Sequence, residues 1–204
     1  MDAPRPGRLA RVSGAVLVGG ASQRMGSDKT HLKFAGVALA ARAAALLTDF
    51  LEDVVLVGGD PPAEAPGRRV PDPEGSRCAL RGLVGALEAA RGERVVVLAT
   101  DLPLLTPDLV LGLIAQPPAD AVVPRNTDGS HPLCAVYRRE AVLAAARAHL
   151  VQDRLALRPL LETLETRFVE GDALRALDPD GTALLNVNDE SDLARARERA
   201  AALR

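Results

Sequence analysis

Short apolar runs alternate along this chain with alanine- and leucine-rich stretches of helical length. The runs Ser13–Val18, Val54–Val57 and Arg94–Ala99 are continuous and bounded by polar or glycine-rich turns, as is typical of strands buried on both faces. Between them, Val37–Leu51 and Leu80–Arg91 have the composition of helices. Because short apolar strands that alternate with helices favour parallel pairing, the sequence predicts an α/β fold with a mainly parallel sheet.

The remaining predicted elements continue this alternation. Further strands are predicted at Leu32–Phe34, Arg69–Pro71, Asp120–Pro124, Pro132–Tyr137 and Arg167–Val169. Further helices are predicted at Arg139–His149, Arg158–Leu164 and Glu190–Leu203. Another helix is expected to begin at Thr106–Pro107, because threonine is a favoured N-cap and proline a favoured first helical residue. We therefore expect a flexible leader at residues 1–11 and a single domain at residues 12–204.

The composition disfavours several functional classes. With 48% hydrophobic residues the chain can bury a core, yet its apolar runs fall short of the ~18 residues of a transmembrane helix. A net charge of −2 and 2% aromatic residues provide neither the basic surface nor the stacking side chains of a nucleic-acid-binding protein. Two cysteines, Cys78 and Cys134, are too few for a disulfide framework. We expect a cytoplasmic protein that binds neither nucleic acid nor membrane.

The segment after the first predicted strand has the chemistry of a phosphate-binding loop. It runs Gly19-Gly20-Ala21-Ser22-Gln23-Arg24-Met25-Gly26-Ser27-Asp28-Lys29. Paired glycines allow backbone N–H groups to approach a ligand closely, while Arg24 and Lys29 offer a planar fork and a point charge for phosphate oxygens. The spacing fits neither a Walker A loop nor a dinucleotide-binding motif. An ordinary mobile loop is the alternative, but glycines and basic residues together favour phosphate binding.

Two further segments carry side chains suited to a metal ion. Asp101 stands where the apolar run Arg94–Ala99 ends, and a carboxylate is a hard ligand that Mg²⁺ takes together with phosphate oxygens. The alternative is that Asp101 only begins a turn. Asn186 and Asn188 share one side of an extended segment, where their amide oxygens could complete a magnesium shell or hold a ribose. The alternative there is that Asn188 or the next residue caps the following helix.

Together these motifs resemble those of the molybdenum cofactor guanylyltransferases, which belong to the glycosyltransferase-A-like nucleotidyltransferases. The matching residues follow the family's order from about Ala15 to Leu193: Gly19-Gly20, Arg24-Met25-Gly26, Asp28-Lys29, Asp101-Leu102-Pro103, His131-Pro132 and Asn186-Val187-Asn188. The Gly-Gly and Asp-Lys pairs favour the guanylyl branch over the related cytidylyltransferases. The resemblance implies a three-layer, Rossmann-like α/β fold with a mainly parallel mixed sheet.

The resemblance also implies a role for each matching residue. The nucleotide contacts would be Leu17, Val18, Gly19, Gly20, Lys29, Asp72 and Asp101. The residues acting on the reacting phosphates would be Arg24, Lys29 and Asp101. Mg²⁺ would be held by Asp101 with Asn188 or Asn186 as a second ligand, and the acceptor would enter near Arg125 and His131. The other histidines, His31 and His149, are expected at the surface.

The activity that the resemblance implies is magnesium-dependent transfer of GMP from GTP to the phosphate of molybdenum-molybdopterin, with release of pyrophosphate. Molybdoenzyme maturation proteins would be further partners. The chain departs from the family at Cys78-Ala79-Leu80-Arg81-Gly82, where Gly-Pro-Leu-Ala-Gly is usual, so base specificity stays open. Two alternatives remain. One is a nucleotidyltransferase of this fold that uses CTP or another phosphorylated acceptor, and the other is a nucleotide-binding module without turnover.

Overall fold

Strands and helices alternate along the part of the chain that the computed structural model describes, namely residues 9, 11–18 and 32–202. The strands are β1 (Val12–Leu17), β2 (Lys33–Phe34), β3 (Val37–Ala38), β4 (Asp53–Val57), β5 (Arg68–Val70), β6 (Arg94–Ala99), β7 (Ala121–Asn126), β8 (Gly129–Ser130), β9 (Cys134–Arg138) and β10 (Thr166–Val169). The helices are α1 (Leu39–Thr48), α2 (Ala79–Ala89), α3 (Pro107–Ile114), α4 (Arg139–Val151), α5 (Leu157–Glu162), α6 (Gly171–Leu177) and α7 (Glu190–Ala202).

Most of the strands form one mixed sheet in the order β10-β7-β9-β6-β1-β4-β5, with β8 paired to β7 outside this order. β1 is parallel to β4 and β6, β4 to β5, and β7 to β10. β9 runs antiparallel to both β6 and β7, so β7 has the same direction as β6. The carboxyl ends of all strands except β8 and β9 therefore meet at one edge of this sheet, which we call the carboxyl edge. Open α/β sheets bind their ligands at this edge.

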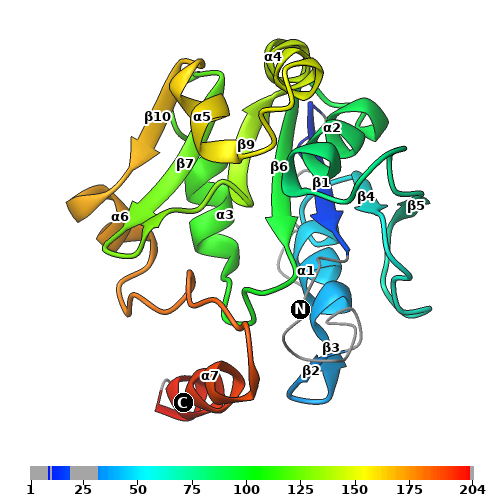
Figure 1. Cartoon of the computed structure of the whole chain (residues 1–204). Helices are drawn as coiled ribbons and strands as arrows, with labels where there is room; N and C mark the ends of the chain where they lie inside the picture. The colour runs from blue at the N-terminus through cyan, green and yellow to red at the C-terminus, as the bar shows by residue number, and fades with distance from the viewer. Residues whose placement is uncertain (1–8, 10, 19–31, 203–204) are drawn as a thin grey trace.

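Two apolar layers hold helices against opposite faces of the sheet (Figure 1). Val16 and Leu98 belong to the layer under α1, α3 and α6. Val55 and Val97 belong to the layer under α2, α4 and α5. All four side chains are fully buried, because neighbouring residues of a strand face opposite sides and both sides are covered. The predicted three-layer α/β fold with a mainly parallel mixed sheet is thus confirmed.

Two helix starts show how local sequence sets the element bounds. The prediction for α3 is confirmed, since the Thr106 hydroxyl accepts a hydrogen bond from the Leu109 N–H at 3.3 Å and a proline follows it. The helix predicted from Val37 begins instead at Leu39. Val37 and Ala38 instead pair in antiparallel fashion with Phe34 and Lys33. A helix that began at Val37 would break this pairing.

The sequence did not predict α6. Its buried residue is Leu174, and such a short helix carries too little apolar pattern to be recognised. It packs against α3 at Gly112, where an added Cβ would lie 2.3 Å from Leu177 Cδ2. Close approach of the two helices therefore depends on a residue without a side chain. None of the helices in the described ranges is long and apolar enough to cross a membrane.

Helix α7 lies below the carboxyl edge, apart from the two main layers (Figure 1). A small third core joins it to the β2–β3 hairpin and the start of α1. Its buried residues are Phe34, Leu39, Val187, Leu193 and Ala196. The last part of the described chain is thereby brought to the edge where the predicted site residues gather.

Candidate functional site

At the ends of β1 and β4 the backbone leaves no room for side chains. The Val18 N–H donates to the Val57 carbonyl at 2.8 Å. Gly59 has a φ of +55°, and an added Cβ there would lie 2.6 Å from the Val18 carbonyl oxygen. Val18 itself is buried at 2% exposure. A residue without a side chain at position 59 therefore lets the ends of β1 and β4 approach each other closely.

Asp72 follows β5 and faces the same glycines. An added Cβ at Gly58 would lie 2.1 Å from Asp72 Oδ1, so the carboxylate rests directly on the backbone there. Its Oδ2 is 2.7 Å from Arg77 Nη2, and both side chains are well exposed. An exposed ion pair contributes little stability. Asp72 can therefore exchange this partner for a hydroxyl group of a ligand at little cost.

The stretch that departs from the family opens α2 and packs beneath β1. An added Cβ at Gly82 would lie 3.2 Å from Leu17 Cδ1, so a small residue lets the end of β1 approach the helix. The guanidinium of Arg81 points elsewhere: its Nη1 donates to the Glu74 carbonyl at 2.9 Å. It also covers Gly75, where an added Cβ would lie 2.7 Å from Arg81 Cζ. Arg81 therefore holds the loop at Glu74 and Gly75, which follows Asp72, in place.

Asp101 stands at the end of β6 in a loop tied to two other elements. The Pro103 carbonyl accepts a hydrogen bond from Arg42 Nη2 of α1 at 3.0 Å. The Val187 N–H donates to the Asp101 carbonyl at 2.8 Å. Val187 is fully buried, while Asn186 and Asn188 on either side of it are exposed. The backbone thus brings the predicted asparagine pair beside Asp101, although the two segments are far apart in sequence.

The cap of α7 is provided by Asp189. Its Oδ1 accepts from the Asp192 N–H at 2.9 Å and from the Ser191 hydroxyl at 2.7 Å. The Asp192 N–H, with help from Ser191, lowers the pKa of the Asp189 carboxyl and so keeps it charged at the positive end of the helix. Asp192 Oδ2 in turn accepts from the backbone N–H of Asn188 at 2.8 Å. Capping therefore uses the side chain of Asp189, and the Asp192 carboxylate in turn holds the backbone N–H of Asn188.

The carboxylate of Asp101 and the amide oxygens of Asn186 and Asn188 are groups of the kind that Mg²⁺ binds. Mg²⁺ is commonly held by one or two carboxylates together with phosphates of the substrate, rather than by a cage of protein groups. In residues 9, 11–18 and 32–202 no three His, Cys, Asp or Glu side chains are grouped so that they could enclose a metal ion. A site built on Asp101 with an asparagine amide requires no such group.

At the other end of the edge, the β7–β8 hairpin fixes the orientation of His131. Asn126 Oδ1 accepts from the Asp128 N–H at 3.0 Å and lies 3.0 Å from His131 Nε2. Because a backbone N–H can only donate, the atom facing both groups is the amide oxygen, and Nε2 must carry a hydrogen. Sequence reasoning missed Asn126, although Asn-Thr-Asp-Gly is a turn signal that could have indicated it.

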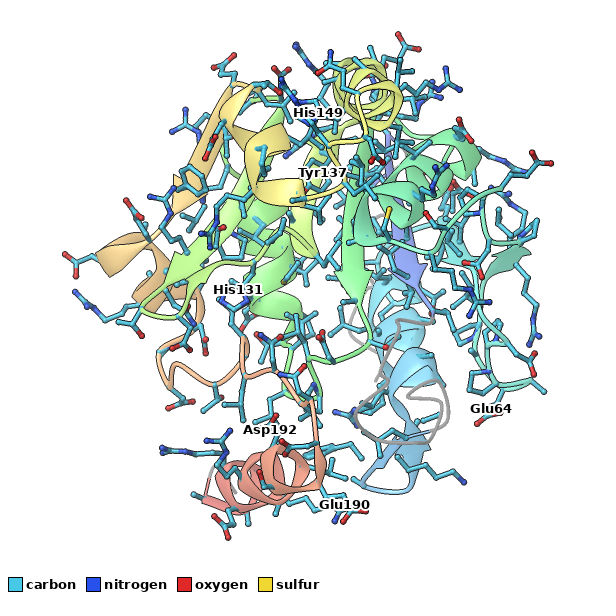
Figure 2. All side chains as sticks on the ribbon, in the orientation of Figure 1. Glu64, His131, Tyr137, His149, Glu190 and Asp192 are labelled. Carbon is cyan, nitrogen blue, oxygen red and sulfur yellow. The ribbon has the colours of Figure 1, made fainter. Side chains whose placement is uncertain are left out.

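The environment of His131 favours its neutral form. Burial lowers its pKa below the ordinary value, against the opposing effect of the Asp128 and Asp101 carboxylates. With Nε2 protonated, the neutral ring carries its lone pair on Nδ1. His131 lies toward the carboxyl edge, whereas Tyr137 and His149 lie at the opposite end of the sheet (Figure 2).

Arg125 lies at the end of β7, next to β10. Its guanidinium carbon is 3.3 Å from the centre of the Phe168 ring, and its Nη1 is 3.4 Å from Glu170 Oε2. The His131 N–H donates to the carbonyl of Pro124 at 3.0 Å. Arg125 and His131, both expected near the acceptor, are thus held by the same hairpin.

Other predicted residues are placed differently or lie beyond the described ranges. Gly19, Gly20, Arg24, Lys29 and His31 lie outside the residues that the structure describes. The expectation that His149 is at the surface is wrong: it is 5% exposed, because it shares the buried face of α4. Cys134 is fully buried, and burial, reinforced by Asp101 and Asp178, raises its pKa to about 12, so it is no nucleophile.

A family model described as "MobA-like NTP transferase domain" matches residues 14–167 of the chain. The chain belongs to this family. Two curated members are similar over nearly their whole length. "Probable molybdenum cofactor guanylyltransferase" of Pelotomaculum thermopropionicum is 32% identical, covering 93% of this chain and 93% of that protein. "Molybdenum cofactor guanylyltransferase" of Desulfosudis oleivorans is 30% identical, covering 91% of this chain and 94% of that protein.

Solved structures support the same fold. Molybdopterin-guanine dinucleotide biosynthesis protein A from Archaeoglobus fulgidus superposes with a TM-score of 0.79 at 24% identity, covering 93% of this chain and 99% of that one. The 2-C-methyl-D-erythritol 4-phosphate cytidylyltransferase from Thermus thermophilus gives a TM-score of 0.69 at 17% identity, covering 92% and 98%. This MobA-like chain therefore shares its fold with nucleotidyltransferases that differ in substrate.

Proposed function

We propose that this chain transfers GMP from GTP to the phosphate of molybdenum-molybdopterin. The observation that carries the proposal is the 32% identity to a relative named as a probable molybdenum cofactor guanylyltransferase, over 93% of both chains. In the reaction, an oxygen of the acceptor phosphate forms a bond to the α-phosphorus of GTP. The bond from that phosphorus to the bridging oxygen breaks, and pyrophosphate leaves with the electron pair.

The nucleotide would bind at the end of the edge formed by β1, β4 and β5. Leu17, Val18 and Gly19 would contact the guanine and ribose, and Gly20 would be a further nucleotide contact. The Asp72 carboxylate would accept a hydrogen bond from a nucleotide hydroxyl. The close packing of Gly59 on Val18 supports this assignment only in that it holds the ends of β1 and β4 together at the carboxyl edge. Arg24 and Lys29 would bind the phosphates and offset the charge that develops on pyrophosphate.

Asp101 would hold Mg²⁺, with the amide oxygen of Asn188 or Asn186 as a second ligand. When bound, the ion would neutralise charge on the phosphates and align them for in-line displacement. The chain's own contribution is to position Asp101. The bonds from Arg42 to the Pro103 carbonyl and from Val187 to the Asp101 carbonyl support this role, since they anchor the loop from both sides.

The acceptor would enter near Arg125 and His131. Its phosphate is ionised at neutral pH, so the chemistry requires no protein base. Neutral His131, with its lone pair on Nδ1, would accept a hydrogen bond from the acceptor rather than supply charge. After transfer, molybdoenzyme maturation proteins would receive the product.

The proposal is tested by measuring pyrophosphate release from GTP, CTP and ATP separately, with Mg²⁺ and molybdenum-loaded molybdopterin. We expect release with GTP, and none when the metal is removed with EDTA. Formation of the guanine dinucleotide should match pyrophosphate in a one-to-one ratio. Release with CTP alone would assign the chain to the cytidylyl reaction. Saturable GTP binding without release from any nucleotide would favour a binding module without turnover.

A further inference from the structure

A pocket of about 310 Å³ opens between the β7–β8 hairpin, β10 and α5. Its charged lining residues are Arg125, Arg158 and Glu162, and Phe168 and Ser130 also border it. This volume lies at the lower end of the range for small-molecule sites. The mechanism proposed above uses Arg125 from this set and leaves Arg158, Glu162 and Phe168 without a role.

One wall of the pocket is a flat cation. Arg125 stacks on Phe168 with 3.3 Å between its guanidinium carbon and the ring centre. Its Nη1 also lies 3.4 Å from Glu170 Oε2. A guanidinium supported in this way keeps its plane fixed. Planar rings stack well on such a surface, because guanidinium is delocalised and weakly hydrated.

The opposite wall comes from α5, on which Arg158 and Glu162 are four residues apart and share one face. Arg158 reaches the hairpin: an added Cβ at Gly129 would lie 3.8 Å from its Nη2. The pocket thus combines a stacking surface, a carboxylate and a second guanidinium. A carboxylate has two oxygens side by side, which match two adjacent N–H donors.

This combination fits an aminopyrimidinone ring. Such a ring is flat, and it presents an amino group beside a ring N–H at one edge and a carbonyl oxygen next to them. We propose that the pocket binds the pterin of the acceptor, with the ring stacked on Arg125, its N–H edge paired with Glu162 and its carbonyl facing Arg158. This inference rests on the proposed function, which supplies the pterin acceptor, and adds the pocket in which the ring lies.

Guanine presents the same edge, so GTP is the competing occupant. The order of strands favours the acceptor. The pocket lies at β7 and β10, and the glycine-rich nucleotide end lies at β1, β4 and β5, while β6 with Asp101 stands between them. Two substrates that react at Asp101 would approach it from opposite sides, which suits an in-line displacement.

The experiment is a fluorescence titration of the full chain with pterin-6-carboxylate, whose carboxylate is remote from the N–H edge. We expect saturable binding that Glu162→Gln weakens about tenfold or more, because a charge-assisted pair is lost. Glu165→Gln is the matched control: Glu165 is exposed, close in sequence and outside the pocket. Similarly, Arg158→Ala should weaken binding, whereas Arg167→Ala should not, since Arg167 precedes Phe168 and faces the other side of β10.

Several results would overturn the inference. These are equal binding by wild type and Glu162→Gln, absence of saturable binding by folded wild type, and competitive displacement of the pterin by GTP. Circular dichroism spectra of each variant establish that the fold is retained. Direct binding separates this inference from the proposed function. A chain that binds the pterin as predicted but transfers no GMP would refute the function and keep the pocket.

Discussion

The two ends of the carboxyl edge are built by opposite means. At the end formed by β1, β4 and β5, close packing depends on glycines: added Cβ atoms at Gly58 and Gly59 would collide with Asp72 and Val18. At the end formed by β7, β8 and β10, long side chains fill the surface instead, with Arg125 stacked on Phe168. The first end is therefore sensitive to added atoms, and the second to removed or altered charges.

Asp101 lies between the two ends, so its replacement should separate chemistry from binding. We expect Asp101→Asn to reduce kcat by about 10³-fold, because the amide keeps the shape but removes the charge that holds a metal ion. GTP and acceptor should still bind. Timed assays of pyrophosphate release at saturating substrate measure this change in kcat. Asp108→Asn, at an exposed position of α3, is the control that should leave kcat unchanged, and near-normal turnover of the Asp101 variant would remove Asp101 from the mechanism.

Gly59→Ala tests whether the first end rejects added atoms. Strain at positive φ and the contact with the Val18 carbonyl should together lower the free energy of unfolding by about 1–3 kcal/mol. GTP should bind about tenfold more weakly. Urea unfolding and a GTP titration measure the two effects. Gly36 also has positive φ, +83°, but has open space around it, so Gly36→Ala should cost about 1 kcal/mol and leave the GTP affinity intact. Equal effects of both variants would contradict the steric account.

Asn126→Asp alters charge at the second end without changing size. A carboxylate beside His131 Nε2 should raise the pKa of that histidine, reversing the lowering caused by burial. The ring would then stay protonated to higher pH, and its Nδ1 would become a donor. NMR titration of the ring should show this shift, and the acceptor KM should rise about threefold to tenfold at pH 7 while the GTP KM stays constant. An unchanged His131 titration would refute the role of Asn126.

Arg81→Ala should have the smallest effect. It removes the hydrogen bond to the Glu74 carbonyl and loosens the loop after Asp72, so the GTP KM should rise about twofold to threefold with kcat unchanged. Arg91→Ala, at an exposed position after α2, serves as the control. A loss of discrimination between GTP and CTP would mean that Arg81 contacts the base, contrary to its position over Gly75.

Most of the fold could be predicted because its signals are local. A run such as Arg94–Ala99 is apolar enough to identify a buried strand without reference to the rest of the chain. The short helix Gly171–Leu177 could not be predicted, because it depends on the distant Gly112. His149 was misassigned although Val142, Ala146 and His149 have the spacing of one helix face, so this error lay in the interpretation rather than in the sequence.

The same distinction applies to the site. Asp101 and the Asn186–Asn188 segment could be proposed because each follows or precedes a recognisable element. Arg125 was named from the resemblance, but the pocket around it could not be found, since Arg158 and Phe168 come from two other elements and neither stands in a motif. Only the fold brings these side chains together.

The bond from the Val187 N–H to the Asp101 carbonyl has a consequence for the newly made protein. Synthesis runs from the amino end, so the loop after β6 leaves the ribosome long before the segment that holds it. Until then the loop of Asp101 lacks the bond from Val187, and the apolar side chains of Phe34 and Leu39 lack their cover from Leu193. A nascent chain can therefore form its sheet early, but the loop that carries Asp101 is held by Val187, and Phe34 and Leu39 are covered, only after residues 187–193 have left the ribosome.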